Sequence, residues 1–472
     1  MKQQQELVYT DLVKAHMLMG LIDLLLVMIF GLTYSLTFLN IHIVDPYMSP
    51  VRLRFNHTNV AAYGFLANCI TGALYWAVPR MTGHPVWNRA YGWLLWAALQ
   101  VAGIGTVISL LFFGGTMLGG PELSRWIGPQ SVEWSETPFI MDVPITLWLF
   151  VVIPQFLVPI IKASKEKPLY TGLWYITAGL VWTPMVYVLG NYPSVFFYPG
   201  AAGAALNGTF IHDLVGLYVT PMGWGLMYYF VPRVLQKPIW SHGLGLLGFW
   251  GLAFFYPAQG VHHYLWSPIP MFAQYAAVFA TIAIEIVVTT VLVNFMMTLR
   301  GSYGAMKEDM ALRWFYVGMI NYWITCFQCS IQVLLTTQKV IHFTDWVTGH
   351  AHLIMFGTFG FWLLGMYEHI VPRMYGLKYT YSRPLSEMAF WFMLIGTEVM
   401  FVDLGVAGIA EGFAWIAQVP FIDSVNLGKP FWWVRTASGI FIFTGYIAYF
   451  YNILKTMAVG RAYQASTKVA TA

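Results

Sequence analysis

Long apolar stretches recur from one end of the chain to the other. Each has 18 or more residues, and about 20 residues of α-helix cross a hydrocarbon core about 30 Å thick. Only 9% of the residues are charged, against about 25% in soluble proteins. The sequence therefore predicts an all-α polytopic membrane protein, with twelve transmembrane helices in a single bundle and one domain over residues 1–472. The expected spans are 16–39, 59–79, 90–115, 141–163, 170–190, 208–232, 243–264, 272–298, 313–338, 346–372, 387–412 and 434–456.

The positive charges predict the orientation of these spans. With twelve spans both termini lie on one side, and eighteen of the 24 Lys and Arg residues belong to that side. Short cytoplasmic loops carry the excess of Lys and Arg, so both termini are expected in the cytoplasm. The net charge of +4 reflects this bias and indicates no nucleic-acid partner.

Half of the twelve histidines share one predicted depth. They lie at the outer ends of four non-adjacent spans, and so in the outer leaflet: His57, His212, His262, His263, His350 and His352. Because ionisable groups are costly inside a bilayer, a layer of imidazoles from separate helices indicates a functional site. The other histidines receive no ligand role: His16, His84, His242 and His369 lie near inner span ends, where interfacial imidazoles are common, and His42 lies in an outer loop.

The stretch TDWVTGHAHLIMFG, residues 344–357, carries two of these histidines. Residues two apart on an α-helix lie about 200° apart around its axis. His350 and His352 therefore face opposite sides of one helix and cannot share a metal, but each can serve its own cofactor. Either of them, paired with His57, gives the bis-imidazole ligation of a low-spin haem.

The remaining three imidazoles are expected to form one metal site. His262 and His263 lie about 100° apart on a helix and can converge on one ion, with His212 as a third ligand. Three neutral imidazoles suit copper, iron or zinc.

Several motifs resemble those of a known family. They are RLRFNHTN at 52–59, MYYFVP at 227–232, PMFAQ at 270–274 and HFTDWVTGHAH at 342–352. Over essentially all twelve spans the chain resembles the catalytic subunit of the haem–copper oxidase superfamily. It is most similar to the C-type (cytochrome cbb) oxygen reductases, and next to the cytochrome-c-dependent nitric oxide reductases.

The resemblance implies two haems and one further metal ion. By it, His57 and His352 bind a low-spin haem b, and His350 is the proximal ligand of a high-spin b-type haem. A copper ion, or a non-haem iron in the reductases, is implied at His212, His262 and His263.

One tyrosine distinguishes the two chemistries. C-type oxidases resemble this chain in having a tyrosine six residues before the His-His pair, as an extra donor of an electron and a proton for O₂ reduction; here it is Tyr256. On an α-helix Tyr256 lies within about 20° of His263, the same face as a metal ligand. The reductases are similar except that they lack this tyrosine and carry a glutamate at the position of Gly216, which favours iron. Reduction of O₂ to water is therefore predicted, with reduction of NO to N₂O as the alternative.

Two residues depart from the oxidase pattern. Gln328 stands where both relatives carry a glutamate, and Glu285 lies in mid-span, near an acid of the nitric oxide reductases. Glu285 is expected to act in proton transfer. The polar residues expected to line a path for protons from the cytoplasmic side are Tyr228, Tyr229, Glu285, Thr289 and Asn321.

Two outer segments are predicted to lie near haem propionates. The acidic loop EWSETP, residues 133–138, resembles the calcium-binding segment of both relatives, so Glu133 and Glu136 are calcium candidates. Arg52, Arg54 and His342 are expected near the propionates.

The sequence also predicts the partners. The chain has no c-type haem motif, since the pair in CFQC at 326–329 is not followed by histidine, so a separate c-type cytochrome subunit is expected to deliver electrons. The expected surroundings are lipid of a bacterial or archaeal cytoplasmic membrane, with the metal sites in the outer half. A secondary transporter is the rival from another class, but such proteins carry internal repeats, and none is expected here.

Overall fold

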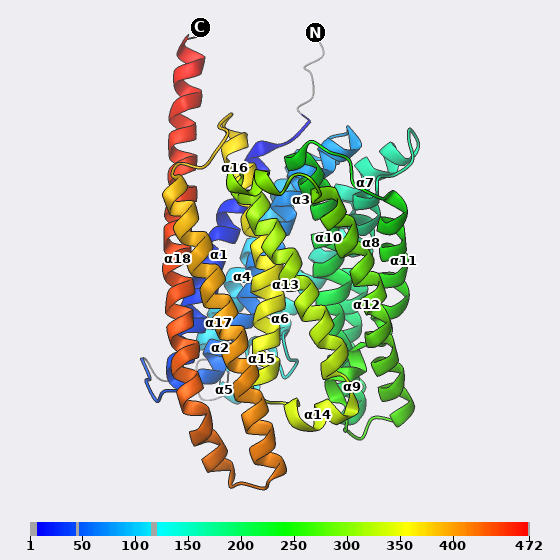
Figure 1. Ribbon diagram of the computed structural model, residues 1–472, viewed down its shortest axis with the longest axis vertical. Coiled ribbons are helices and arrows are strands. Elements are labelled where there is room, and N and C mark those ends of the chain that lie inside the picture. The colour runs from blue at the N-terminus through cyan, green and yellow to red at the C-terminus, as the bar shows by residue number, and fades with distance from the viewer. Residues whose placement is uncertain (1–6, 44–46, 115–119, 471–472) are drawn as a thin grey trace. The chain divides into compact units, whose positions relative to one another are not determined.

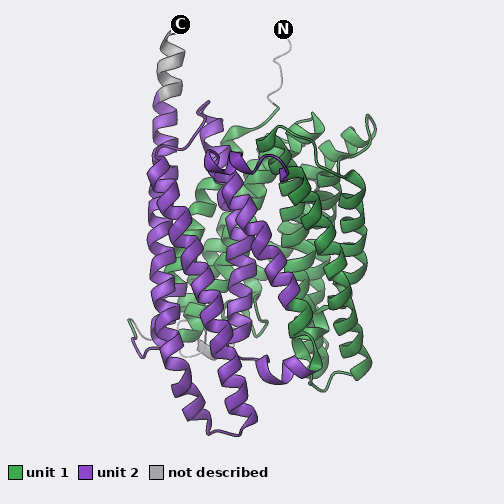
Figure 2. Cartoon of the chain, in the orientation of Figure 1, with its two compact units in different colours: residues 1–30, 42–298, 329–335 green, residues 31–41, 299–328, 336–472 purple. Residues whose placement is uncertain are grey.

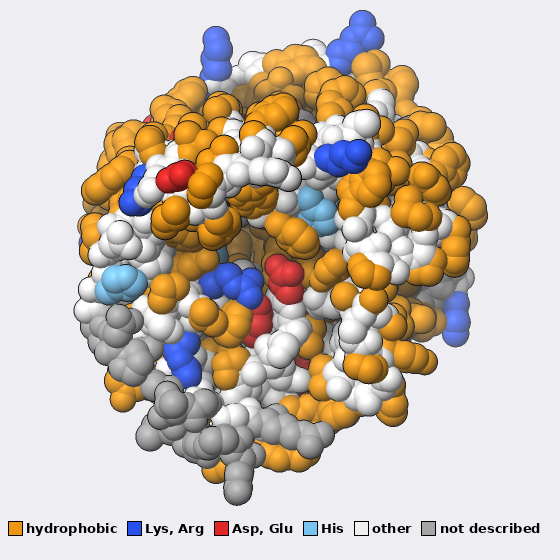
Figure 3. Space-filling view, turned by 90° about the horizontal axis from the view of Figure 1, so that it is seen from below, with side chains coloured by type: hydrophobic (Ala, Val, Ile, Leu, Met, Phe, Trp, Pro, Cys, Tyr) orange, Lys and Arg blue, Asp and Glu red, His pale blue; other side chains and the backbone are white. Residues whose placement is uncertain are grey.

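Every regular element of the protein is a helix in the part that the structure describes, residues 7–43, 47–114 and 120–470 of the computed structural model (Figure 1). By its internal contacts the chain divides into two compact units (Figure 2). Hydrophobic side chains cover most of the face seen in Figure 3, and charged ones are few.

The first unit comprises residues 1–30, 42–298 and 329–335. Its elements are α1 (Thr10–Thr37, whose last turns belong to the second unit), α2 (Pro50–Asn59), η1 (Val60–Leu66), α3 (Ala67–Thr82), α4 (Arg89–Phe112), α5 (Gly120–Ile127), α6 (Phe139–Val151), α7 (Ile153–Ser164), α8 (Thr171–Phe196), α9 (Ala201–Asp213), η2 (Leu214–Val219), α10 (Thr220–Leu235), α11 (His242–Phe255), η3 (Tyr256–Ala258), η4 (Gly260–Tyr264) and α12 (Met271–Leu299).

The second unit comprises residues 31–41, 299–328 and 336–472. Its elements are η5 (Tyr303–Lys307), α13 (Met310–Gln332, whose end belongs to the first unit), α14 (Leu335–Ile341), α15 (Asp345–His352), η6 (Leu353–Gly360), α16 (Phe361–Met374), α17 (Arg383–Ile416) and α18 (Phe421–Ala470).

Eleven helices among the described residues are long and apolar enough to cross a membrane. They correspond to eleven of the twelve predicted spans. The predicted span 313–338 forms the 23-residue helix α13, which is not among the eleven. The all-helical, membrane-spanning fold is therefore confirmed, whereas the number twelve stays a prediction.

A repeated sequence feature organises the helices, contrary to the expectation that the chain has no internal repeat. The tripeptide Val-Pro-Arg closes three helices, at 78–80, 231–233 and 371–373. Ten or eleven residues after the valine of each tripeptide, the chain reaches the N-cap residue of the next helix. The side chain of that residue accepts a hydrogen bond from a backbone N–H of the first turn. These N-caps are Asn88 of α4, Ser241 of α11 and Ser382 of α17.

An amide side chain from a later helix binds the backbone of each N-cap residue. In every case the amide oxygen accepts from the N-cap N–H, and the amide nitrogen donates to the N-cap carbonyl, at 2.7–3.3 Å. The pairs are Gln155 with Asn88, Asn294 with Ser241 and Asn452 with Ser382. Because hydrocarbon offers no hydrogen-bond partners, the clamps satisfy the N-cap N–H groups, which have no partner within the helix, and add a second donor to carbonyls that already accept the first helical N–H.

Four of the six candidate ligands lie at fixed distances in sequence from a Val-Pro-Arg tripeptide. His57 and His350 lie 21 residues before the valine, and His212 and His352 lie 19 residues before it; these two spacings are called registers. A π-helix follows the histidines in each repeat, namely η1, η2 and η6. π-Helical turns are rare and occur frequently at functional sites. Residue Pro221 follows η2 and lacks the N–H that an α-helical turn would need there.

The count of spans yields a test of topology. If α13 also crosses the membrane, both termini share the Lys/Arg-rich side. A green fluorescent protein fused after residue 472 is therefore expected to fluoresce in intact cells, whereas one inserted in the loop at 197–200 is expected to be dark. A dark C-terminal fusion would contradict the cytoplasmic assignment.

Candidate metal and haem-binding site

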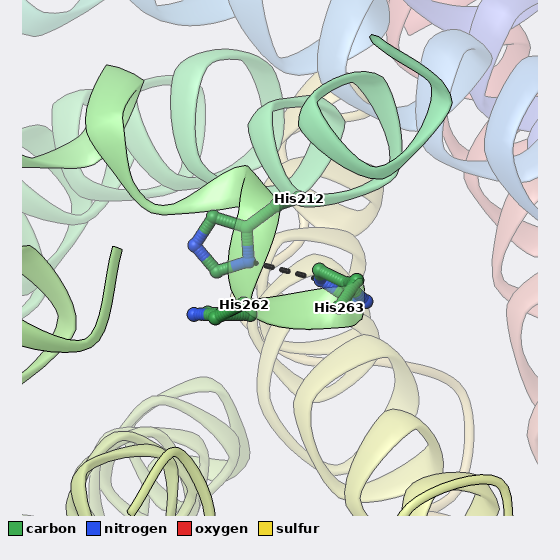
Figure 4. A group of neighbouring side chains, drawn as sticks. All are labelled: His212, His262 and His263. Carbon is green, nitrogen blue, oxygen red and sulfur yellow. Dashed lines mark hydrogen bonds between the residues drawn. The ribbon is translucent and has the colours of Figure 1, made fainter. Parts of the chain in front are cut away.

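The structure brings together three of the predicted ligands, His212, His262 and His263 (Figure 4). One ring nitrogen of each lies within 4.8 Å of the others. His212 Nδ1 points at His263 Nε2, 3.3 Å away. Two nitrogens bound tetrahedrally to one metal, with bonds of about 2.0–2.1 Å, lie about 3.3–3.4 Å apart. The geometry therefore fits a shared first-row metal ion.

The segment carrying the His-His pair is 3₁₀ rather than α-helical, so consecutive residues lie about 120° apart around its axis instead of the predicted 100°. Helix α11 ends at Phe255, and two 3₁₀ turns, η3 and η4, carry the chain to Tyr264. Gly260 permits this path, because a Cβ on it would lie 2.2 Å from Thr209 Cα of α9. The close backbone approach brings His262 and His263 to His212 despite the different geometry.

Buried polar side chains orient two of these imidazoles. The Thr281 hydroxyl donates to the Ala277 carbonyl at 2.7 Å, so its oxygen accepts from His262 Nδ1, also at 2.7 Å. This leaves His262 Nε2 as a lone-pair donor for a metal. Gln259 Oε1 accepts from His212 Nε2 at 2.9 Å, which leaves His212 Nδ1 as the donor on the side of His263. Such outer partners fix both tautomers.

Tyr256 stacks on His212, with ring centroids 4.6 Å apart and planes 16° apart. The predicted position on the His263 face is thus wrong, since the helix ends before this residue. The ring fits because of Gly216 in η2: a Cβ there would lie only 1.6 Å from Tyr256 Cε1. Any larger residue at 216 therefore competes with the tyrosine ring for the same space.

A fourth predicted ligand, His57 of α2, is anchored within the first unit. Its Nδ1 donates to the Val27 carbonyl of α1 at 2.8 Å. The Nε2 lone pair is therefore directed away from that contact, as haem ligation requires.

The last two predicted ligands are anchored in the same way within the second unit. His350 Nδ1 donates to Gln328 Oε1, and His352 Nδ1 donates to the Thr348 carbonyl, each at 2.8 Å. Gln328 departs from the glutamate of both relatives. Its side-chain oxygen accepts the Nδ1 proton of His350 and so fixes the tautomer of that imidazole. An imidazole that donates through Nδ1 carries its lone pair on Nε2, and this tautomer fits axial ligation of haem iron.

The acidic outer loop gives no support for calcium. Glu136 is almost fully buried, and its two oxygens accept from Arg54 Nη2 at 2.8 Å and from Asn59 Nδ2 at 2.7 Å. Glu133 lies 3.9 Å from Arg54 Nη1. Burial raises the pKa of the Glu136 carboxyl, and Arg54 opposes that rise. The guanidinium thus supplies the positive charge that a calcium ion was expected to supply.

The three residues expected near propionates have other partners. Arg54 pairs with Glu136, and Arg52 donates to the carbonyls of Leu110 and Phe113, at 2.7 and 3.0 Å, at the end of α4. His342 is half-buried and stacks on Phe343, with centroids 4.0 Å apart.

The predicted proton-path residues do not form one group. Tyr228 is fully buried and accepts from Asn294 at 3.3 Å, and Tyr229 is half-buried beside it on α10. Glu285 lies on α12, with Oε1 buried and unpaired among the residues described, whereas Thr289, one turn on, is exposed.

Asn321, the fifth of these residues, lies in the second unit. It donates to the Gly357 carbonyl at 2.9 Å. Its amide therefore satisfies a backbone group of η6.

Comparison with known proteins identifies the fold and the family. Residues 11–441 match the family model described as cytochrome c and quinol oxidase polypeptide I. The chain belongs to this family. It is thus a subunit I of the haem–copper oxidases.

Individual relatives agree with this assignment. The chain is 26% identical over 442 residues to the cbb3-type cytochrome c oxidase subunit CcoN1 of Stutzerimonas stutzeri, covering 90% of each chain. It is 28% identical over 434 residues to a bacteroid cytochrome c oxidase subunit 1 homolog of Bradyrhizobium diazoefficiens, covering 88% of this chain and 76% of that one. A weaker match, 23% over 121 residues, is to a nitric oxide reductase of Stutzerimonas stutzeri, covering 24% of this chain and 25% of that one.

A solved structure shares the fold. A haem–copper terminal oxidase dimer determined by cryo-EM superposes with a TM-score of 0.79 at 12% sequence identity. The match covers 95% of this chain and 84% of that chain.

The contact of Gly216 with Tyr256 yields a test of packing. Gly216→Ala is expected to destabilise the protein by about 1–3 kcal/mol, because the added Cβ overpacks the tyrosine ring. The measurement is the melting temperature of the detergent-solubilised protein. Gly103→Ala on α4, where a Cβ would meet nothing within 4 Å, is the matched control. In the Tyr256→Ala background, where the ring is absent, Gly216→Ala should cost much less; an equal cost in both backgrounds would contradict the steric account.

Proposed function

We propose that this chain is the catalytic subunit of a respiratory oxidase that reduces O₂ to water at a haem–copper site. The observation that carries the proposal is Tyr256 stacked on His212, in the space that Gly216 leaves, beside His262 and His263. Reduction of O₂ takes four electrons and four protons and yields two water molecules. A phenol in contact with a metal ligand is suited to supply one electron and one proton.

The donor sets support two haems b and one copper ion. We assign His57 and His352 to the low-spin haem, His350 to the high-spin haem, and His212, His262 and His263 to copper. When bound, these groups accept electrons and bind O₂. Three neutral imidazoles without a carboxylate favour copper over a harder iron centre, and Gly216 leaves no carboxylate at the position that supplies one in the reductases.

The chain's own residues prepare this site. Five of the six candidate ligands have an oxygen partner that fixes the tautomer. His57, His350 and His352 donate Nδ1–H to Val27, Gln328 and Thr348. His262 and His212 donate to Thr281 and Gln259. Fixed tautomers mean that no imidazole must reorient when it binds a metal. Tyr256 and His212 are both at least nine-tenths buried, which limits water at the phenol.

We assign proton delivery from the cytoplasmic side to Tyr228 and Tyr229 on α10 and to Glu285 on α12. The exposure of Thr289 and the contact of Asn321 with Gly357 favour other roles for those two.

The remaining features of the proposal follow the relatives. The curated relatives are named as cytochrome c oxidase subunits, which supports electron delivery by a separate c-type cytochrome subunit. We place the chain in a bacterial or archaeal cytoplasmic membrane as one catalytic domain, with both termini inside and the metals in the outer half. Calcium is left out of the proposal, because Arg54 occupies the carboxylates.

Nitric oxide reduction is the second candidate. Glu285, whose Oε1 is buried and unpaired among the described residues, and the partial match to a nitric oxide reductase favour it. The packing counts against it. With the Tyr256 ring in its place on His212, a glutamate at 216 does not fit, because its Cβ would lie 1.6 Å from Tyr256 Cε1.

Removal of one hydroxyl tests the oxidase assignment. Tyr256→Phe keeps the ring stacked on His212 but removes the transferable proton, so O₂ turnover is expected to fall at least a hundredfold (about the size of a general acid–base contribution). O₂ consumption by the purified enzyme is the measurement, with haem spectra unchanged. Tyr275→Phe, at an exposed tyrosine of α12, is the control. Retained O₂ turnover, or one non-haem iron per chain in place of copper, would favour the reductase.

The contact of Gln328 with His350 gives an independent test. Gln328→Glu replaces a neutral acceptor by a carboxylate, which increases the basicity of the imidazole and stabilises oxidised iron. The midpoint potential of the high-spin haem is expected to fall by about 60 mV, a tenfold change for one electron. Gln332→Glu, one turn on along α13, is the control. An unchanged potential in Gln328→Glu would show that this contact does not tune the haem.

A further inference from the structure

A polar cluster lies inside the first unit, away from the predicted ligands. It consists of His16 and Asp23 of α1, Asn68 of α3 and Gln100 of α4, and is called here the Asp23 cluster. His16 is fully buried, Asn68 is 1% exposed, and Asp23 and Gln100 are each 9% exposed. His16 thus lies inside the protein beside Asn68 and not on its surface.

Asn68 connects the members of the cluster. Its Nδ2 donates to Asp23 Oδ2 at 2.8 Å, and its Oδ1 accepts from Gln100 Nε2 at 2.9 Å and from His16 Nδ1 at 3.1 Å. His16 Nε2 is consequently a lone-pair acceptor, and it is buried without a partner among the described residues. The cluster thus holds one carboxyl and one unused acceptor, both able to take up a proton.

No cation neutralises Asp23 within the described part of the first unit. On α1, Asp11 pairs with Arg89 at 2.8 Å, and Lys14 lies nine residues before Asp23, about half a turn around the helix. Arg89 is the charged residue of α4, and it lies about three turns from Gln100.

The segment from α2 to α3, which contributes Asn68 to the cluster, also supplies no counter-ion for Asp23 among the described residues. Arg80 donates to the Trp76 carbonyl at the inner end of α3. The remaining titratable or charged groups of this segment are Arg52 and Arg54, engaged as described above, His57 on the Val27 carbonyl, Tyr63 on the Trp134 carbonyl, Tyr75 stacked on His16, and Cys69.

A carboxylate without a counter-ion is costly at membrane depth, and its presence indicates a function. A purely structural link between helices needs no ionisable group, since asparagine would accept from Asn68 equally well. A carboxyl differs from asparagine by its ability to bind and release a proton.

The cluster lies close to the candidate low-spin haem site through two segments, α1 and η1. Asp23 lies four residues before Val27 on α1, so it is on the same face and about 6 Å along the axis from the carbonyl that holds His57. The Asp23 carboxyl also packs on η1, the π-helix that follows His57: a Cβ on Gly64 would lie 3.0 Å from Asp23 Cγ.

We propose that the Asp23 cluster is a proton-binding site whose occupancy is linked to the electron on the haem held by His57. The inference rests on the proposed function, because His57 is a ligand only in that function. An electron arriving at the haem increases the negative potential at Asp23, so the cluster takes up one proton; loss of the electron releases it. Linkage is reciprocal, so proton binding in turn favours reduction of the haem.

Reductive titration of the low-spin haem at several pH values tests this inference. In the purified wild-type complex the reduction equilibrium is expected to shift up to tenfold per pH unit over the range in which the cluster binds its proton. Asp23→Asn should abolish this dependence while preserving the hydrogen bond from Asn68. Asp11→Asn, at the Arg89-paired carboxylate of the same helix, should retain it.

A second readout separates protonation from packing. In redox difference infrared spectra the wild type should show a carboxylic acid C=O band that shifts in D₂O and is missing in Asp23→Asn. A haem with unchanged spectrum and unchanged pH dependence in Asp23→Asn would overturn the inference alone. A wild-type complex without a low-spin haem band would overturn the proposed function, and the inference with it.

Discussion

A polar group inside a bilayer must find its hydrogen-bond partner within the protein, and most features of this chain follow from that constraint. The three amide clamps, at Asn88, Ser241 and Ser382, satisfy helix ends where chains turn. Asn321 satisfies a carbonyl of the π-helix η6. The same requirement binds one ring nitrogen of each haem-ligand candidate to a carbonyl or amide oxygen. What supports the fold therefore also determines which nitrogen each histidine offers to a metal.

The repeat accounts for the positions of four of the six candidate imidazoles, His57, His212, His350 and His352. Each repeat delivers histidines 21 or 19 residues before its Val-Pro-Arg, and only the third repeat uses both registers. That helix therefore presents His350 and His352 to different surroundings, while the first and second repeats present one each. The π-helix of each repeat lies between the ligand-bearing turns and the turns that end in Val-Pro-Arg, and so shifts the helical phase between them.

The sequence alone was sufficient for the helical membrane fold, the family and the cluster of His212, His262 and His263, because long apolar stretches and ionisable residues within them are strong signals. It was insufficient where local geometry departs from an α-helix. The helix gives way to 3₁₀ turns within 256–264, so Tyr256 stacks on His212 and not on the face predicted from an α-helix. The spacing of apolar residues does not predict where such a break occurs. Arg54 was assigned to propionates because its partner Glu136 is 82 residues away. The Val-Pro-Arg repeat, by contrast, is legible in the sequence and was missed because the segments between its copies differ in length. Asp23 was overlooked because a single acid near the middle of a span has no motif.

The overlap between position 216 and the Tyr256 ring has a consequence for how such enzymes diverge. A residue larger than glycine at 216 meets the phenol ring, so the ring must leave its place on His212 when a carboxylate arrives there. Substitutions at 216 and 256 are therefore coupled, because each changes which side chain the other position can hold.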